Sequence, residues 1–573
     1  MHVHAKFKKD DVISDLYFTA PVDVLTETDY SLASALHQAE IYAKAGKYVI
    51  PAVTYEAGSG GAQGEWPAFV IGVFDAPVTE AVFSSGYRGD GVYRMGELKF
   101  LEHQDDFMYN IEKIRGYIRD GHTYQVNYTT RMEGNFSGDA HALFRQLTSN
   151  NNGDYAIFIA WDGRSIVSCS PELFFEVDEY RRIRTRPMKG TAKRYSDAAA
   201  DAESYTFLKD SKKDRAENVM IVDLLRNDLS KVAKAGTVEV PELFTIEKYE
   251  TVYQMTSTVE ACLRDDVGLP EIMNALFPCG SITGAPKAIT MEIIGTMENT
   301  PRGFYCGTLG MMFPDGTTVF NVPIRTLYIE AGRYIYGAGG GITYDSDPES
   351  EYAEMVAKTS FLKGGMYQLI ETMRLEDGAV KRLDLHEARI LKSAGNLSYT
   401  LPDFKKSVLA YTAAQNLDVA DGLFKVRAAA ELDGTVSVTH AMIGETDAAE
   451  AKLANGEIKA PAVFLENKTT VRHQYHSTDN EFSIVLYYNE YHRVTEFNIG
   501  NLVVEEAGVF YTPPLTDGLL GGVMRRSLIE RDVLRERSFT KTELIRKYTG
   551  GDIQLYMINS LKEWVKISLN VSG

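Results

Sequence analysis

Hydrophobic and polar residues follow two kinds of pattern along the chain, one typical of strands and one typical of helices. Residues 155–160 and 318–322 are short apolar runs rich in β-branched and aromatic side chains, which predicts buried strands. Residues 214–229 instead repeat apolar side chains at helical spacing, which predicts an amphipathic helix. This mixture favours an α+β or layered α/β fold for the first part of the chain. We expect the acidic, alanine-rich segment 197–203 to be a mobile surface segment.

A boundary between two domains is predicted near residue 365. The helical pattern before it stops at the paired glycines Gly364 and Gly365. From Tyr367 the chain alternates like a strand, and residues 376–378 supply the turn of a hairpin. We therefore expect one domain over residues 1–365 and a second over residues 366–573.

Composition limits the classes of partner. The 573 residues are 44% hydrophobic and 24% charged, as in folded globular proteins, and the formal net charge is -19. That charge argues against a nucleic-acid partner, whereas a small anion would need a local metal ion, arginines or backbone amides. The sequence has no run of about 18 apolar residues and no signal peptide at its start, so we expect a cytoplasmic protein without membrane contact. The four cysteines lack paired spacing and are expected to be buried thiols.

Two kinds of pattern suggest anion and metal chemistry. Glycine-containing segments at 279–287, 305–310 and 337–342 would let backbone amides approach an anion, although such glycines often serve only turns. Carboxylates recur at helical spacing, at Asp214 and Glu217 and again with Lys358 at Glu351 and Glu354. Such carboxylates suit Mg²⁺; the alternative is a solvated helix surface with salt bridges.

The ordered segments of the first domain resemble those of chorismate-utilising enzymes. They are Ser170-Pro171-Glu172-Leu173-Phe174, Pro187-Met188-Lys189-Gly190-Thr191, Lys213-Asp214-Arg215-Ala216-Glu217-Asn218, Gly280 to Lys287, Ile324-Arg325-Thr326, Gly337 to Gly341 and Glu351-Tyr352-Ala353-Glu354. The resemblance implies an α+β fold of layered β-sheets with surrounding helices.

Two positions distinguish reactions within this family. The residue that corresponds to Lys189 is typically alanine in anthranilate synthases and lysine in aminodeoxychorismate synthases. Gln125 stands where isochorismate and salicylate synthases typically carry a lysine base. The resemblance therefore implies amination of chorismate at C4, with Lys189 as covalent nucleophile and Glu172 as proton carrier.

The same resemblance assigns the remaining residues of the first site. Mg²⁺ would be held by Glu217 and Glu354, supported by Asp214 and Glu351. The substrate would be bound by Thr283, Tyr305, Arg325, Gly339, Gly340, Gly341 and Lys358.

The second domain resembles class IV pyridoxal-phosphate enzymes with an α/β aminotransferase-like fold. The matching segments include His386 to Arg389, Asn467 to Arg472, Val494 to Glu496 and Gly518 to Arg525. The resemblance implies that Lys468 binds the cofactor covalently and that Glu496 pairs with its pyridinium nitrogen. The cofactor phosphate would contact Arg389, the amides of Val523 and Met524, and Ser560.

Together the two resemblances imply a bifunctional 4-aminobenzoate synthase. The first domain would form aminodeoxychorismate, and the second, a lyase, would release pyruvate. None of the cysteines lies in a nucleophile-elbow context, so ammonia is expected from a separate glutamine amidotransferase or from solution. Class IV relatives are commonly dimers, which implies a homodimer through the second domain. The alternatives are an anthranilate synthase with an appended class IV aminotransferase, and a second domain that is not catalytic.

Overall fold

The chain divides into two compact units, Met1–Gly365 and Met366–Gly573, which are described separately. The computed structural model describes the whole chain except residues 10–11, 59–63, 65, 97, 149–152, 196, 250–251, 364–366, 398, 402, 418–421, 432–433, 445–447, 459, 461, 473–474, 476–483 and 571–573, and gives only the backbone of residues 198, 360, 363, 462 and 463. In this part of the chain, no helix is long and apolar enough to cross a membrane.

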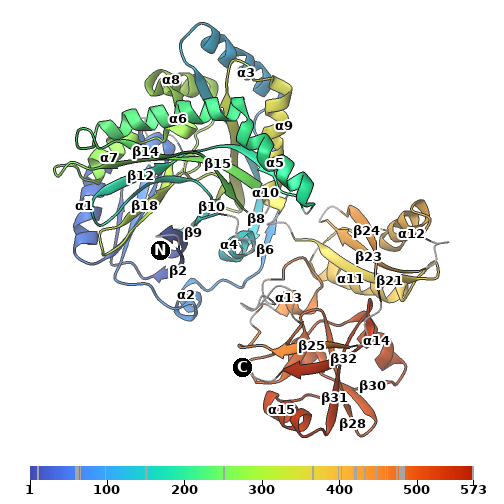
Figure 1. Ribbon diagram of the computed structural model, residues 1–573. Coiled ribbons are helices and arrows are strands. Elements are labelled where there is room, and N and C mark those ends of the chain that lie inside the picture. The colour runs from blue at the N-terminus through green and yellow to red at the C-terminus, as the bar shows by residue number, and fades with distance from the viewer. Residues whose placement is uncertain are drawn as a thin grey trace. The chain divides into compact units, whose positions relative to one another are not determined.

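Unit 1 is built around two antiparallel β-sheets (Figure 1). The first has the order β16 (Gly284–Ala285), β8 (Gln125–Gly138), β20 (Arg333–Ile342), β19 (Thr326–Glu330), β10 (Arg164–Ser170), β9 (Tyr155–Trp161), β1 (His2–Lys9) and β2 (Val12–Thr19), with β6 (Tyr93–Met95) and β7 (Lys99–Phe100) on β8. The second has the order β13 (Met188–Lys193), β15 (Val252–Cys262), β12 (Arg182–Arg186), β11 (Leu173–Val177), β18 (Thr318–Asn321), β17 (Thr308–Met312), β4 (Tyr48–Val53), β5 (Phe69–Phe74) and β3 (Asp23–Thr26), with β14 (Glu239–Lys248) on β15.

A shared apolar layer joins the two sheets. Val3 and Phe7 of the first sheet belong to the same buried cluster as Ile50, Leu309 and Val319 of the second. Burial of these side chains on both inner faces is the main stabilising contribution to such a sandwich. The strands expected at 155–160 and 318–322 are confirmed as β9 and β18.

The helices of unit 1 cover the sheets and connect their strands. Their bounds are α1 (Leu32–Lys44), α2 (Glu80–Tyr87), α3 (Gln104–Arg119), α4 (Ala140–Thr148), α5 (Ala198–Asp210), α6 (Lys212–Ser230), α7 (Leu269–Leu276), α8 (Lys287–Met297), α9 (Pro348–Lys358) and α10 (Ser360–Lys363). The helix expected at 214–229 is confirmed as α6, which buries Ile221, Leu225 and Leu229 against the second sheet and runs along it in Figure 1.

Residues 197–203, expected to be a mobile surface segment, lie at the surface and form the start of helix α5. Asp197 caps α5 by accepting a hydrogen bond from the backbone N–H of Ala200 at 2.9 Å. Asp201 pairs with Arg194 at 2.9 Å and accepts a hydrogen bond from Tyr253 at 2.7 Å. A cap, the high helix propensity of alanine and an ion pair to Arg194, directly after β13, explain why this segment is helical.

Unit 2 contains a small sheet and a closed barrel. The small sheet has the order β22 (Ala379–Val380), β21 (Leu369–Glu376), β23 (Leu423–Ala430) and β24 (Val436–Met442). The larger sheet has the order β27 (Val494–Phe497), β26 (Ile484–Tyr488), β25 (Ala448–Leu453), β32 (Glu563–Asn570), β31 (Ile553–Asn559), β28 (Gly500–Glu506), β29 (Val509–Thr512) and β30 (Leu534–Glu536). Because β27 also pairs with β28, the sheet closes on itself around an apolar core.

The helices of unit 2 are α11 (Leu383–Leu397), α12 (Phe404–Ala414), α13 (Ala462–Glu466), α14 (Val523–Glu530) and α15 (Lys541–Thr549). The hairpin expected after residue 367 is confirmed as β21 and β22. All four cysteines are free thiols, and Cys169, Cys279 and Cys306 are buried, whereas Cys262 is partly exposed.

Candidate active sites

In unit 1, Lys189 and Glu172 adjoin the same short loop. Lys189, on β13, donates a hydrogen bond from Nζ to the carbonyl of Ser281 at 3.4 Å. Glu172 is buried, and no hydrogen-bond partner of its Oε1 is found among the described residues. Burial raises the pKa of Glu172, while a hydrogen bond with Ser281 and the charge of Lys189 oppose that rise. A buried carboxyl with a raised pKa beside an amine is a suitable proton carrier.

The strand that carries Lys189 is held by a glutamine and shaped by a glycine. Gln254 donates from Nε2 to the carbonyl of Gly190 at 2.8 Å and accepts from the hydroxyl of Thr191 at 2.7 Å. Gly190 has φ +81, and a Cβ there would lie 2.8 Å from the Cβ of Asp214. Only glycine therefore allows β13 to approach α6 this closely.

Four carboxylates from two helices lie near Lys189. Burial raises the pKa of Glu217, the charges of Lys189 and Lys213 oppose this, and the carboxylates of Asp214 and Glu351 add to it. Glu217 on α6 therefore lies within electrostatic reach of both Lys189 on β13 and Glu351 on α9.

The carboxylates of α9 differ from each other. Burial raises the pKa of Glu351, a hydrogen bond from Ser346 opposes this, and the neighbouring Glu354 adds to it. The exposed Glu354 pairs with Lys358 at 2.9 Å. Desolvation raises the pKa of Glu354, but the charge and hydrogen bond of Lys358 together with the charges of Lys213 and Lys189 outweigh it, so the pKa is lowered.

These oxygen ligands are chemically suited to Mg²⁺. Among the described residues no group of three or more His, Cys, Asp or Glu side chains is arranged to hold a metal ion. Mg²⁺ often uses only one or two carboxylates and completes its shell with water and substrate oxygens. A cation here would also offset the neighbouring negative charges, which add to desolvation in raising the pKa of Glu217 and Glu351.

The predicted glycine triplet faces α9. Gly339, Gly340 and Gly341 on β20 pair with Thr129, Tyr128 and Asn127 on β8. A Cβ on Gly340 would lie 3.4 Å from Oε2 of Glu351 and 3.6 Å from Nζ of Lys358. Lys358 also donates a hydrogen bond to the carbonyl of Gly339 at 2.6 Å.

Gln125 lies at the end of this triplet. A Cβ on Gly341 would lie 2.0 Å from Nε2 of Gln125. The Gln125 side chain is buried, and its Oε1 has no hydrogen-bond partner among the described residues. A buried carbonyl oxygen of this kind is available to accept a hydrogen bond from a small donor.

Three other predicted substrate residues are held by neighbouring groups. Thr283 donates its hydroxyl to the carbonyl of Cys279 at 3.1 Å. Tyr305 is buried, with the guanidinium of Arg131 5.3 Å from its ring centroid. The guanidinium of Arg325 lies 6.0 Å from the ring centroid of Phe361. The structure thus places Lys189 near Glu172 and the helix carboxylates. Thr283, Tyr305 and Arg325 instead contact other neighbouring residues.

Unit 2 has a cavity of about 320 Å³ beside Lys468. Its lining combines β21, α11, the start of α14 and strands of the barrel, and comprises Ile370, Thr372, Arg389, Lys468, Arg472, Tyr475, Glu496, Phe497, Asn498, Ile499, Gly500, Asn501, Leu520, Gly522, Val523, Ile558, Asn559, Ser560, Leu561 and Lys562. Desolvation and the charge of Arg389 lower the pKa of Lys468 to about 8, so its amine loses a proton more readily than a free lysine does.

Glu496 lies at another wall of this cavity. It is buried on β27 opposite Asn501 of β28, and burial raises its pKa to about 7. It accepts hydrogen bonds from the hydroxyl of Tyr475 at 2.8 Å and from Asn501 at 3.2 Å. A carboxyl that titrates near neutrality can share a proton with an aromatic nitrogen.

The predicted phosphate contacts are only partly available. Val523 begins α14 and lines the cavity, and Ser560 presents a buried hydroxyl without a hydrogen-bond partner among the described residues. Met524 packs its side chain into an apolar cluster, which leaves only its backbone amide for an anion. Arg389 lines the cavity but pairs with the buried Glu371 at 2.8 Å. The helix start and the unpaired Ser560 hydroxyl fit the phosphate of pyridoxal phosphate.

Several site residues were missed or left without a role by the sequence analysis. Glu371, between Arg389 and His386, was quoted only as part of a segment, and the described contacts now show it as their shared partner. Arg472 and Tyr475 line the cavity of unit 2, and the Arg472 guanidinium lies 4.7 Å from the Tyr475 ring centroid. In the sequence, only their closeness to Lys468 along the chain pointed to these two residues, and such closeness does not show that their side chains line the same cavity.

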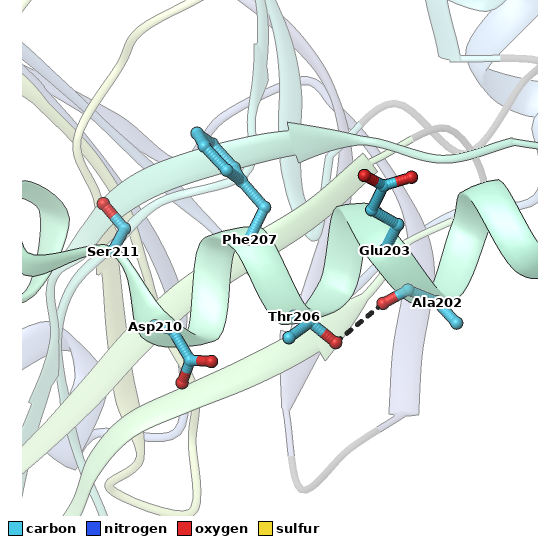
Figure 2. A pocket seen from close by; sticks show the side chains of 6 residues that line it. All are labelled: Ala202, Glu203, Thr206, Phe207, Asp210 and Ser211. Carbon is cyan, nitrogen blue, oxygen red and sulfur yellow. Dashed lines mark hydrogen bonds between the residues drawn. The ribbon is translucent and has the colours of Figure 1, made fainter.

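Another surface hollow does not resemble an active site. It lies along α5 and is lined by Ala202, Glu203, Thr206, Phe207, Asp210 and Ser211 (Figure 2). Thr206 donates its hydroxyl to the carbonyl of Ala202 within the helix, and Phe207 is 71% exposed. None of the predicted site residues lines this hollow.

Comparison with known families agrees with this architecture. A family model described as chorismate binding enzyme matches residues 90–364, and one described as amino-transferase class IV matches residues 368–569. The chain therefore joins a chorismate binding enzyme domain to a class IV amino-transferase domain, as the sequence analysis expected. The second family implies pyridoxal phosphate as cofactor.

Individual relatives show which enzymes of this family the first domain is similar to. Aminodeoxychorismate synthase component 1 of Escherichia coli (strain K12) is 41% identical over 248 residues, which cover 43% of this chain and 54% of the relative. Anthranilate synthase component 1 1 of Haloarcula marismortui is 40% identical over 255 residues, which cover 44% of this chain and 52% of the relative. The chain thus spans about half the length of these curated relatives.

A solved structure supports the fold. The menaquinone-specific isochorismate synthase of Escherichia coli aligns with a TM-score of 0.52 and 17% identity, over 64% of this chain and 88% of that one. This likeness concerns the fold alone.

Proposed function

We propose that this chain makes 4-aminobenzoate from chorismate in two steps, amination at C4 in unit 1 and pyruvate release in unit 2. The observation that carries the proposal is the setting of Lys189, which lies within electrostatic reach of the buried Glu172 and of Glu217 and Glu354 in a chorismate binding enzyme domain. An amine at this position can act as a covalent nucleophile, which anthranilate formation does not need.

The first reaction is derived from these groups. The Lys189 amine adds to C2 of the ring, and the C4 hydroxyl leaves as water after protonation by Glu172. Ammonia then bonds to C4, the C2–nitrogen bond to Lys189 breaks, and Glu172 accepts the proton released by ammonia. The raised pKa of Glu172 suits this exchange because the carboxyl holds a proton at higher pH than an exposed glutamate does.

Recognition of chorismate rests on local positive groups and dipoles in an acidic protein. Glu217 and Glu354, supported by Asp214 and Glu351, would hold Mg²⁺, whose charge would attract the ring carboxylate. Lys358, Arg325, Tyr305, Thr283 and the amides of Gly339 to Gly341 would bind the enolpyruvyl side. Gln125, whose Oε1 is buried and unpartnered among the described residues, would accept a hydrogen bond from ammonia.

In the second reaction, pyridoxal phosphate would supply an electron sink for cleavage of the bond to the pyruvyl group. Lys468 would bind the cofactor and move a proton with its readily deprotonated amine. Glu496 would hold a proton at the pyridine nitrogen, and the start of α14 with Ser560 would bind the phosphate. Elimination leaves 4-aminobenzoate and pyruvate.

Two further elements of the proposal concern assembly. Relatives named as component 1 suggest that ammonia comes from a separate glutamine amidotransferase. The class IV domain would form a homodimer, as its relatives commonly do.

The test is product analysis with the purified full chain. Chorismate, ammonium and Mg²⁺ should yield aminodeoxychorismate, and added pyridoxal phosphate should convert it to 4-aminobenzoate with release of one pyruvate per product. Ortho-aminobenzoate as the main product would favour anthranilate synthesis instead. Aminodeoxychorismate that accumulates despite added cofactor would favour a non-catalytic second unit.

A further inference from the structure

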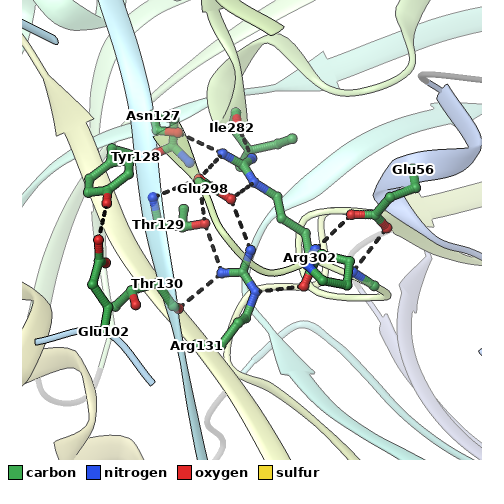
Figure 3. A network of polar contacts seen from close by, with 12 residues as sticks. Glu56, Glu102, Asn127, Tyr128, Thr129, Thr130, Arg131, Ile282, Glu298 and Arg302 are labelled. Carbon is green, nitrogen blue, oxygen red and sulfur yellow. Dashed lines mark hydrogen bonds and ion pairs between the residues drawn. The ribbon is translucent and has the colours of Figure 1, made fainter. Parts of the chain in front are cut away.

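A triad of buried charges lies inside unit 1, between the loop after α8 and β8. Arg131 and Arg302 are each 1% exposed, and both pair with Glu298 (Figure 3). Arg131 donates from Nη2 to Oε2 of Glu298 at 3.0 Å, while Arg302 donates to Oε2 at 3.0 Å and to Oε1 at 2.7 Å. None of these three residues was singled out by the sequence motifs.

A second carboxylate offsets the charge of the triad. Burial opposes ionisation of Glu298, but the guanidinium groups of Arg302 and Arg131 outweigh it, so the pKa of Glu298 is lowered. The carboxylate of Glu56 accepts hydrogen bonds from the backbone N–H groups of Arg302 at 2.6 Å and Gly303 at 3.0 Å, and it lies within electrostatic reach of Arg131. Two carboxylates therefore face two guanidinium groups, and loss of one of these buried partners would leave a charge uncompensated.

The outward-facing contacts of the triad hold the walls of the proposed chorismate site. Arg302 donates hydrogen bonds to the carbonyl of Ile282, next to Thr283, and to that of Asn127, which pairs with Gly341; both distances are 2.7 Å. These bonds fix two walls of the site relative to each other.

Arg131 and Glu298 extend the same support. Arg131 lies over the ring of Tyr305, and Glu298 accepts hydrogen bonds from the backbone N–H and the hydroxyl of Thr129, each at 2.9 Å. Thr129 pairs with Gly339, so the triad contacts the strand opposite the glycine triplet.

We infer that Arg131, Glu298 and Arg302 are positioning residues that shape the pocket for the carboxylates of the substrate. The inference rests on the proposed function, because it assumes that chorismate binds between Tyr305, Thr283 and the glycine triplet. The network acts through these groups and does not touch the reacting atoms.

Thr129→Val gives the decisive test, because it is nearly isosteric and preserves every charge. It removes the hydroxyl bond to Glu298 and the bond that the hydroxyl accepts from Arg131 at 2.9 Å. Thr185→Val is the matched control, since Thr185 is buried on β12 and its hydroxyl has no partner among the described residues. Steady-state kinetics with chorismate and ammonium and thermal unfolding would be measured for both.

Thr129→Val should raise the KM for chorismate about tenfold, the effect of one or two bonds to charged groups. The kcat and the KM for ammonium should stay within about twofold, as expected for binding lost equally from ground and transition states. Thr185→Val should leave all three constants unchanged. An equal KM for chorismate in the two variants, or a fall in kcat alone, would overturn the inference.

Glu298→Asp and Glu298→Gln provide a second measurement. The aspartate keeps the charge and should give a chorismate KM between those of the parent and of the glutamine variant. If Glu298→Gln does not fold, the comparison of Thr129→Val with Thr185→Val still tests the inference. A parent enzyme that leaves chorismate unchanged would contradict the proposed function. If the parent aminates chorismate but Thr129→Val and Thr185→Val have the same KM for chorismate, only the positioning role of the triad is contradicted.

Discussion

The two proposed nucleophilic lysines lie in opposite electrostatic settings. Lys189 is half-buried on β13, and its charge opposes the burial that raises the pKa of Glu172 and Glu217. It also contributes to the lowered pKa of Glu354. Lys468 lines a cavity in which desolvation and the charge of Arg389 lower its own pKa to about 8. The fold of unit 2 thus prepares its amine by burial beside a cation, whereas unit 1 surrounds its amine with anions.

The two sites therefore differ in what they need to become active. In unit 1 the proposed Mg²⁺ would offset the negative charges around Glu217 and Glu351. In unit 2 the lowered pKa of Lys468 comes from the protein alone, so we expect its amine to lose a proton readily before the cofactor binds.

The largest expected effect is that of Lys468→Met on pyruvate release. Loss of the amine should remove the cofactor absorbance near ~420 nm and lower the rate of pyruvate release by about 10⁴-fold, because one group both binds the cofactor and transfers the proton. Amination of chorismate should continue, so aminodeoxychorismate accumulates. Lys566→Met, at an exposed position on β32, is the control. A cofactor band that persists in Lys468→Met would show that another residue binds the cofactor.

Lys189→Ala should lower the rate of amination by about 10³-fold, because the reaction loses its covalent step. Mass spectrometry after incubation with chorismate and Mg²⁺ without ammonia should find a lysine-dependent adduct in the parent only. Lys193→Ala, exposed on the same strand, should retain both the adduct and the activity. Amination at the parental rate in Lys189→Ala would remove the nucleophile from the proposal, while leaving pyruvate release untouched.

Glu217→Gln should raise the Mg²⁺ concentration for half-maximal amination about tenfold, because one charged oxygen ligand is lost. Titration of Mg²⁺ at saturating chorismate measures this. Glu203→Gln makes the same charge change on the exposed surface of α5 and should leave the titration unchanged. The same shift in both variants would mean that overall charge, not ligation, sets the metal requirement.

The smallest effect concerns the stability of the cofactor-free protein. Lys468→Met should increase the free energy of unfolding at pH 7 by about 3 kcal/mol, because the parent must either bury a charge or release a proton on folding. Since the pKa of Lys468 falls from 10.5 to about 8 on folding, the unfolded chain binds more protons between these values. The parent therefore gains stability as pH rises through that window, and the advantage of the variant disappears near pH 10.5.

Denaturant unfolding without cofactor at pH 7, 9 and 10.5 would measure this trend. Lys566→Met should show no pH-dependent difference from the parent. A difference between parent and Lys468→Met that stays constant with pH would indicate a packing effect in place of a titration effect.

Much of the architecture could be predicted from local pattern. The helical period of 214–229 and the apolar runs at 155–160 and 318–322 correspond to α6, β9 and β18 because burial of one face or one run directly selects these residues. The helix at 197–203 was not predicted, because the contacts that support it come from Arg194 and Tyr253, which lie outside the segment. Local composition carries no information about such contacts.

In the candidate sites too, some features could be predicted from the sequence and others could not. The spacing of Glu298 and Arg302 allows an ion pair along the chain, but nothing in the sequence reveals that Arg131 completes it from 167 residues away. The resemblance selected Arg389 as a phosphate contact, whereas the structure pairs it with Glu371. A motif specifies residue types, but the partners that share a buried charge follow only from packing.

The sequence by itself supplied the candidate residues for the chemistry, because two ordered sets of motifs place a lysine in each of two domains. Tertiary structure alone decided the electrostatic setting of each lysine. Charge interactions and desolvation depend on distance and burial, and these are fixed when β13 meets α6 and when α11, α14 and the barrel enclose Lys468.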